Sequence, residues 1–317
     1  MGKLRRYFWP KTALLFYLDD EKIEAAFGYV EEGGVDIQER RTIAIGKERE
    51  LGEWLEEIRR TYPKIYVSAM LDTINQGALP SCSKSSFERF GVDASLVHSI
   101  CIDESWLAYT SLVEMKWFEK KFEGVDFDFL YSPFVLLYRR CRPLLEARPG
   151  LFVLHQSGTL FLAVFSEERM WYAQVLLVAD GEVKEEMMEE EDEGLEELAF
   201  DLEEIGEDVE PISDVDMLGE FKEELEPKER GVEDASALEL LEYNLDLFEE
   251  MKDAIAKFYH DDRYPHEFIE KVTIFDMDDL GSDLVRYIGD ELFMEASLHR
   301  FDPIETMAEL VAEETGN

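Results

Sequence analysis

The sequence of 317 residues predicts an α/β protein made of two related halves. Two segments, 13–27 and 151–165, open in the same way, each as an apolar strand, a short polar turn and a second apolar strand. A third strand follows each pair, at 35–45 and 170–178. Hydrophobic residues make up 46% of the chain, which is enough for a core in each half. We therefore expect a duplicated fold with one lobe per half.

The first half is expected to contain three antiparallel strands, then a helix and a fourth strand. Residues 47–62 place apolar side chains on one face and end before Pro63, which is typical of an amphipathic helix. Residues 64–70 follow as an apolar strand. The chain is then mixed over 85–131, where the expected elements are helices at 87–90 and 112–122 and a strand at 97–102.

A helix is expected at the junction of the halves, because Ser132 is a good N-cap residue and Pro133 suits the first helical turn. In the second half, residues 235–259 have the apolar spacing of a long helix. The other expected elements are a helix at 193–205, a loop at 211–232, a strand at 272–275, a helix from Gly281 and Ser282 to Leu292, and a strand at 294–301.

The chain is strongly acidic, with 74 Asp and Glu against 32 Lys and Arg. A net charge of −42 repels nucleic acid, so DNA or RNA binding is not expected. The excess is concentrated in residues 181–229, which hold 23 acidic and three basic side chains. This segment is either a solvated run or a docking surface for a basic partner. Its candidate partner-binding residues are Glu189, Glu190, Glu191, Asp192 and Glu193.

The first residues have the opposite character, since Lys3, Arg5 and Arg6 stand beside Phe8 and Trp9. Such a segment is either a disordered terminus or an anchor for a partner or a membrane surface, because aromatic rings favour the interface and basic groups favour anionic headgroups. These five residues are therefore the second set of candidate partner-binding residues.

The cysteines and the hydropathy predict a soluble cytoplasmic protein. Cys82, Cys101 and Cys141 have no CxxC spacing, and their odd number argues against a disulfide framework, so a reducing compartment is expected. No apolar run approaches the roughly 18 to 20 residues of a membrane span.

No catalytic or metal motif stands out, so we expect no enzyme activity, no cofactor and no metal. The sequence contains no P-loop, no dinucleotide fingerprint and no GxSxG, and its five histidines lack zinc-site spacing. Asp19 and Asp20 are explained as a solvated turn. Asp276, Asp278 and Asp279 lack the later Glu of a calcium loop and are explained as an acidic cluster at a helix start.

Several phrases carry a resemblance to a known superfamily: Phe127 to Phe134 before the junction helix, the strand-turn-strand at 151–165, Val272 to Phe275, and Phe301-Asp302-Pro303. With the element order, they make the chain similar to the actin-like ATPase superfamily. Within it, the chain most resembles the PilM and GspL families, the cytoplasmic assembly proteins of type IV pilus and type II secretion machines. The resemblance implies a two-lobed actin-like, RNase H-like duplicated fold.

The chain departs from the superfamily where nucleotide is held. The first phosphate turn is Asp19-Asp20-Glu21, and its carboxylates repel phosphate. The second is His155-Gln156-Ser157-Gly158-Thr159 rather than Asp-x-Gly, and the last strand leads into Asp276 rather than a glycine pair. The nucleotide loops are therefore degenerate, and the resemblance to GspL is favoured over that to ATP-binding PilM.

The resemblance implies a non-catalytic cytoplasmic adaptor of a type II secretion, type IV pilus or competence (DNA uptake) machine. It would couple an assembly ATPase to inner-membrane platform proteins at the inner face of the inner membrane, with peripheral membrane contact and a homodimer left open. The alternatives are an ATP-binding actin-like switch or ATPase with unconventional loops, and an acidic scaffold unrelated to secretion. The expected parts are a basic aromatic segment (1–12), a first lobe (13–149), a second lobe (150–305) with an acidic insert (181–234) and a C-terminal tail (306–317).

Overall fold

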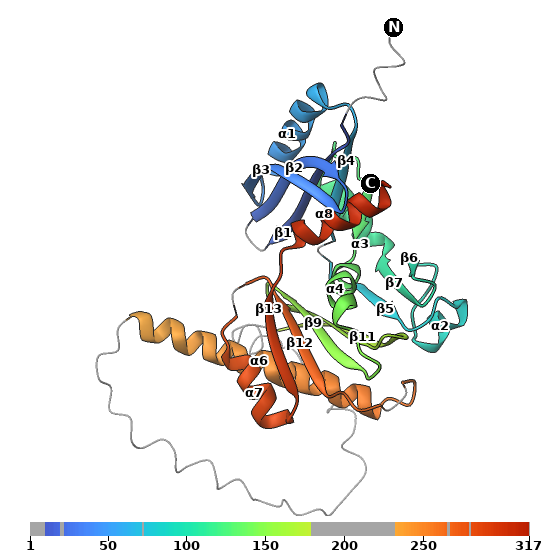
Figure 1. Ribbon diagram of the computed structural model, residues 1–317, viewed down its shortest axis with the longest axis vertical. Coiled ribbons are helices and arrows are strands. Elements are labelled where there is room, and N and C mark those ends of the chain that lie inside the picture. The colour runs from blue at the N-terminus through green and yellow to red at the C-terminus, as the bar shows by residue number, and fades with distance from the viewer. Residues whose placement is uncertain are drawn as a thin grey trace, which may run out of the picture.

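The computed structural model confirms the two-lobed actin-like α/β fold (Figure 1). Its described part contains two five-stranded sheets of the same topology and one three-stranded sheet. No helix among the described residues is both long enough and apolar enough to cross a bilayer. The structure describes residues 10–19, 22–71, 73–178, 232–264, 267–278 and 280–316.

The first lobe is built on a sheet with the order β3-β2-β1-β4-β8. Its first three strands are antiparallel, whereas β4 runs parallel to β1 and β8 parallel to β4. The buried face of α1 (Glu48–Thr61) carries Trp54 and three aliphatic side chains that join the core of this lobe. The strands are β1 (Thr12–Asp19), β2 (Lys22–Glu31), β3 (Gly34–Ala44), β4 (Ile65–Met70) and β8 (Phe129–Tyr131).

The second lobe repeats this arrangement with the order β11-β10-β9-β12-β13, which confirms the duplication. Again three strands are antiparallel and the last two run parallel to the first. Helices α6 (Val232–His260) and α7 (Asp283–Leu292) supply the apolar side chains that close its core. The strands are β9 (Gly150–Gln156), β10 (Thr159–Phe165), β11 (Met170–Leu177), β12 (Lys271–Asp276) and β13 (Glu295–Arg300).

A small subdomain interrupts the first lobe between β4 and β8. Its three-stranded sheet has the order β5-β7-β6, and α3 (Leu112–Lys121) directly follows β7. The sequence predicts β6 and α3 correctly and α2 to within a few residues, but β5 and β7 were not predicted. The elements are β5 (Gln76–Leu79), α2 (Lys84–Arg89), β6 (Val97–Ile102) and β7 (Trp106–Ser111).

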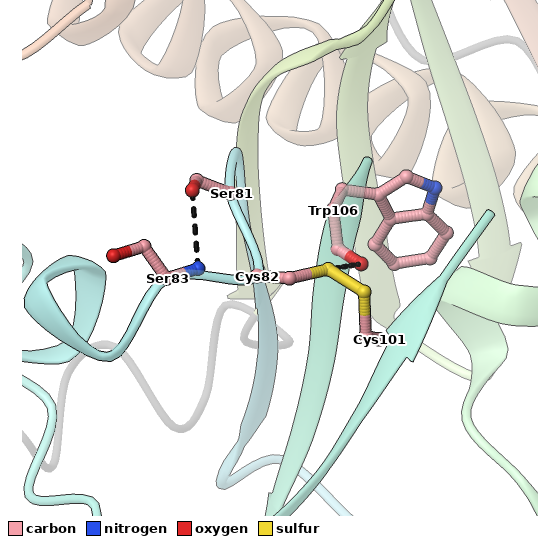
Figure 2. Close-up of a disulfide and its surroundings, with 5 residues drawn as sticks. All are labelled: Ser81, Cys82, Ser83, Cys101 and Trp106. Carbon is pink, nitrogen blue, oxygen red and sulfur yellow. Dashed lines mark hydrogen bonds between the residues drawn. A yellow bond between two sulfur atoms is a disulfide. The ribbon is translucent and has the colours of Figure 1, made fainter. Parts of the chain in front are cut away.

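The expectation that the cysteines are unpaired is wrong for two of them. Figure 2 shows the disulfide between Cys82 and Cys101. Cys101 lies in β6, whereas Cys82 lies beyond the end of β5, where its sulfur atom contacts the Trp106 carbonyl of β7. The chain after β5 thus brings the Cα atoms of the two cysteines to 5.5 Å from each other. An odd count and a missing CxxC cannot reveal this contact, and the cysteines no longer argue for a reducing compartment. Cys141 is buried and free.

Two helices join the lobes. Helix α4 (Pro133–Cys141) begins as expected, because Ser132 accepts a hydrogen bond from the Phe134 N–H; a short 3-10 turn, η2 (Arg142–Leu144), follows it. Helix α8 (Pro303–Glu314) crosses back from the second lobe and lies against β1, β2, β3 and β4 of the first (Figure 1). Arg140 links the two helices through its contacts with Thr306 (2.8 Å) and Glu309 (3.0 Å). Most of the segment expected to be a tail is therefore helix.

Candidate functional site

The ends of β1 and β9, where an actin-like protein holds phosphates, contact each other directly. The Ser157 hydroxyl donates to Asp19 Oδ1 at 2.9 Å, and the Gln156 side-chain amide donates to the Leu18 carbonyl at 2.8 Å. The second turn was expected at 155–158, but His155 and Gln156 belong to β9 and only Ser157 and Gly158 form the turn. Both turn residues have positive φ, 46° and 71°, as a two-residue type I′ hairpin requires.

The end of β12 closes the same site from a third side. Asp278 Oδ2 accepts a hydrogen bond from the Ser157 backbone N–H at 2.5 Å. Burial raises the pKa of Asp278. The hydrogen bond from Ser157 lowers this pKa, whereas the nearby carboxylates of Asp19 and Asp276 raise it further. The backbone donor that an anion would need is therefore bound to a carboxylate of the protein itself.

Beneath this point lies a buried polar network centred on His155. Because β12 pairs in parallel with β9, Asp276 lies opposite His155, whose side chain is 1% exposed. The two side chains are 2.8 Å apart at Nδ1 and Oδ1, and His155 Nε2 lies 2.6 Å from the Tyr243 hydroxyl of α6. Each ring nitrogen of His155 is thus within hydrogen-bonding distance of a side chain that fixes its orientation.

The Asp276 carboxylate accepts several hydrogen bonds within this network. Its carboxylate also accepts from the backbone N–H groups of Asp278 (3.1 Å) and Leu280 (2.7 Å). Burial alone would raise the pKa of Asp276, but the hydrogen bonds from His155 and from the two backbone groups outweigh burial and lower it. The carboxylate is therefore held ionised, and it fixes the path of the chain from β12 towards α7.

Three side chains at this site have atoms of the type that bind metal ions. One ligand atom each from His155, Asp276 and Asp278 lies within 4.8 Å of the others. His155 Nδ1 and Asp276 Oδ1 already satisfy each other, and Asp278 already accepts from Ser157. The set is therefore a closed hydrogen-bonded network that joins β9, β12 and α6.

The space left between the lobes at this point is small. A cavity of about 60 Å³ is lined by described residues of β1, β9 and β10 and by Thr73 and Ile74. Pockets that bind drug-sized ligands measure about 300 to 1,000 Å³. Asp20, Glu21 and Asp279, which the sequence analysis also places at this site, lie outside the described residues. The cavity between the described residues is therefore well below that range.

Replacing Asp278 with Asn should stabilise the protein relative to the natural chain, and this difference should grow as the pH rises. The carboxylate has a raised pKa in the folded state, so its contribution to stability is largest below its ordinary value of 3.8 and is lost as the pH rises through the raised value. The amide introduced by Asp278→Asn keeps an oxygen acceptor for Ser157 but does not titrate. Thermal melts between about pH 4 and pH 7 should show the Tm of the variant increasing relative to that of the natural chain. Asp290→Asn, at an exposed position, is the control; a difference that is constant with pH would contradict the assignment.

A much larger cavity lies elsewhere among the described residues, between the small subdomain and the first lobe. It is a groove of about 840 Å³ between β6 and β8, and Leu310 and Glu314 of α8 also line it. Its apolar side chains include Ile100, Phe127 and Phe129. None of the described residues that line it is Lys or Arg. The acidic lining residues are Glu119, Glu123, Asp126, Asp128 and Glu314.

The walls of this groove include two sheet edges. β6 is paired only with β7, and β8 only with β4, among the described strands. Large apolar side chains are exposed on and beside β6 and on α3: Leu96 (60%), Ile100 (57%), Val113 (73%) and Trp117 (62%). An exposed edge offers backbone donors and acceptors to an added strand. The groove therefore suits an extended, apolar and basic peptide.

Only part of this site was expected from the sequence. Asp19, Asp276 and Asp278 do converge, but His155, Tyr243 and the groove were missed, because each depends on contacts between distant parts of the chain. For His155, the signal that the sequence offered was its position at the turn of the repeated hairpin. The proposed partner-binding residues lie outside the described residues: Lys3, Arg5, Arg6, Phe8, Trp9, Glu189, Glu190, Glu191, Asp192 and Glu193. The expected helix at 193–205 and most of the expected loop at 211–232 lie there too.

Comparisons with known proteins match both halves of the chain. A family model described as Domain of unknown function (DUF8341) matches residues 151–316, and one described as Domain of unknown function (DUF8569) matches residues 8–138. No curated protein matches the sequence.

Solved structures with a similar fold share little sequence with this chain. One is a Bacteroides thetaiotaomicron protein with an actin-like ATPase fold, 8% identical over 100% of both chains, with a TM-score of 0.48. Another is from a PilM-PilN type IV pilus biogenesis complex, 12% identical over 93% of this chain and 89% of the other, with a TM-score of 0.49. A third is MreB5 of Spiroplasma citri bound to ADP, 10% identical over 96% and 95%, with a TM-score of 0.41.

Proposed function

The chain belongs to the family described as Domain of unknown function (DUF8341), and from its geometry we propose that it is a non-catalytic adaptor with an actin-like fold. The observation that carries the proposal is the contact between the two turns. Ser157 bonds to Asp19 with its hydroxyl and to Asp278 with its backbone N–H, so groups that would bind phosphate bind the protein itself. An actin-like fold whose nucleotide loops bond to each other in this way would keep two lobes whose surfaces can bind partners.

The groove between β6 and β8 is the surface best suited to a partner. Its apolar floor and acidic rim would hold a peptide with alternating apolar and basic side chains, and the strand edges would bind its backbone. The residues exposed beside it, such as Val113 and Trp117, would extend the contact. We therefore propose that a peptide tail of the partner protein binds in this groove.

The machine that we propose is a type II secretion, type IV pilus or competence apparatus. The support is the resemblance of residues 127–134, 272–275 and 301–303 to PilM and GspL proteins. In this role the chain would lie at the inner face of the inner membrane. One of its surfaces would bind the assembly ATPase, and the groove would bind the tail of a membrane platform protein.

Millimolar Mg-ATP should change the Tm of the protein by less than about 1 °C. A ligand that binds only the native state stabilises it, by about 2.7 kcal/mol at a concentration of 100 times its Kd. The described cavity at the turns is only about 60 Å³, and the carboxylates around it repel phosphate. Differential scanning fluorimetry with and without Mg-ATP tests this, with Mg²⁺ alone as the control. A rise of several degrees would favour the alternative, an ATP-binding switch.

Site-specific photo-crosslinking in the native host tests the adaptor role. A photoreactive amino acid at Ile100, which lines the groove, should capture a platform protein of the inner membrane. The same residue at Phe293, 89% exposed in the second lobe, is the control. Mass spectrometry then identifies the products. If both positions give the same products, or if none belongs to a secretion, pilus or competence machine, the proposed role is wrong.

A further inference from the structure

The lining of the groove between β6 and β8 favours an occupant with positive charge. Five of its described lining residues are acidic and none is Lys or Arg, so the groove concentrates negative potential over an apolar floor. The carboxylates of Glu119, Glu123 and Glu314 form no hydrogen bond or ion pair with another described residue. An apolar segment with several basic side chains would neutralise them and cover the floor.

This chain contains one such segment. Residues 1–9 have the sequence Met-Gly-Lys-Leu-Arg-Arg-Tyr-Phe-Trp, with three basic side chains, three aromatic ones and no acidic one. They precede the described part of the first lobe. In an otherwise acidic chain, their charge and aromatic content match the charge and apolar floor of the groove.

The attachment point of this segment lies at the same end of the lobe as the groove. The Lys11 ammonium donates to the Thr315 carbonyl at 2.8 Å, and the neighbouring Glu314 lines the groove. The Thr12 N–H donates to the Lys64 carbonyl at 3.0 Å, so β1 begins beside the start of β4. On the other side of β4 lies β8, whose first residue, Phe129, also lines the groove.

The segment is also long enough. Neighbouring strands lie about 4.8 Å apart, so β8 is about 10 Å from β1, with β4 between them. Nine extended residues span about 30 Å. The segment can therefore leave β1, pass the end of α8 and lie along the groove.

We propose that residues 1–9 of this chain occupy the groove between β6 and β8 within the same molecule. The basic side chains face Glu119, Glu123 and Glu314, and the aromatic side chains cover Ile100 and Phe129. Any partner peptide then has to displace a tethered competitor whose effective concentration is in the millimolar range. This inference goes beyond the proposed function, because it does not depend on the machine to which the partner belongs.

A peptide with the sequence of residues 1–9, labelled with fluorescein at its C-terminus, is the probe. The silenced chain carries the five substitutions Lys3→Ser, Arg5→Ser, Arg6→Ser, Phe8→Ser and Trp9→Ser. By fluorescence anisotropy, this chain should bind the peptide at least about tenfold more tightly than the natural chain, whose own segment fills the groove. Its affinity should fall as salt rises, because the contact is largely electrostatic.

Matched charge variants of the silenced chain locate the site. Glu119→Gln, Glu123→Gln and Glu314→Gln together should weaken binding about tenfold, whereas the control Asp290→Asn, Glu291→Gln and Glu295→Gln removes three charges from the second lobe and should leave it unchanged. Thermal melts confirm that all variants fold. Equal binding by the natural and silenced chains overturns the proposal, and so does equal binding by the two charge variants. A natural chain that sediments as a dimer while the silenced chain is a monomer also overturns it, since a second copy then donates the segment.

Discussion

Replacing Asp276 with Ala is expected to lower the free energy of unfolding by about 3 to 5 kcal/mol, the cost of breaking a buried charged network. The substitution leaves His155 without the partner of its Nδ1 atom and leaves the backbone N–H groups of Asp278 and Leu280 without an acceptor. A buried donor without a partner costs about 1 to 3 kcal/mol. Urea denaturation at pH 7, followed by circular dichroism, measures the loss.

Two further measurements distinguish the effect of losing this network from the general effect of removing a carboxylate. Asp290→Ala, at an exposed position of α7, should change stability by less than about 0.5 kcal/mol. Because the pKa of Asp276 is lowered in the folded state, its contribution is present above its ordinary value of 3.8 and is lost as the pH falls through the lowered value. The difference between natural chain and variant should therefore shrink in acid. A loss below about 1 kcal/mol at pH 7 would mean that the network contributes little.

Replacing Trp106 with Ala should lower the free energy of unfolding by about 3 to 5 kcal/mol as well, because a large buried ring leaves a cavity. Trp106 is 1% exposed, and its ring contacts Tyr138 of α4 at 5.4 Å and Phe165 of β10 at 5.8 Å between centroids. Through this ring, β7 of the small subdomain packs against both α4 and the second lobe.

Trp106→Phe is the matched variant. It keeps most of the apolar volume and removes the indole N–H, which is buried and makes no hydrogen bond within the described part of the chain. We expect it to cost less than about 1.5 kcal/mol, well below the alanine variant. Both are measured by urea denaturation. Equal losses for the two variants would show that the ring volume is not what stabilises the junction.

The elements with strong local signals could be predicted from the sequence. The two hairpins, α1, α4 and the described part of α6 follow from apolar spacing, Pro63 and the Ser132 cap, all of which act within a few residues. β5 and β8 could not be predicted because they are short; β5 has four residues, one of them Gly77, and no polar alternation. β7 has six residues and was not predicted either. Such strands form only because neighbouring strands offer them a partner.

The candidate site could be predicted only in part, for the same reason. The acidic residues at the ends of β1 and β12 could be identified because the resemblance to actin-like proteins places the nucleotide loops there. The partner of His155 is 121 residues away in the sequence, and the disulfide of Cys82 depends on the pairing of β7 with both of its neighbours. No local pattern of charge or spacing records these contacts.

Helix α8 has a consequence for the order in which the molecule can fold during synthesis. The first lobe contains the earliest strands of the chain, yet its sheet is covered by residues 303–314, with Ile304, Met307 and Val311 fully buried there. Most domains fold as units, the N-terminal one first, while the ribosome still makes the rest. Here the first lobe must wait, with one apolar face exposed, until the whole second lobe and then residues 303–314 have emerged. The lobe that is made first is thus completed last, which makes it the part of the nascent chain most in need of a chaperone.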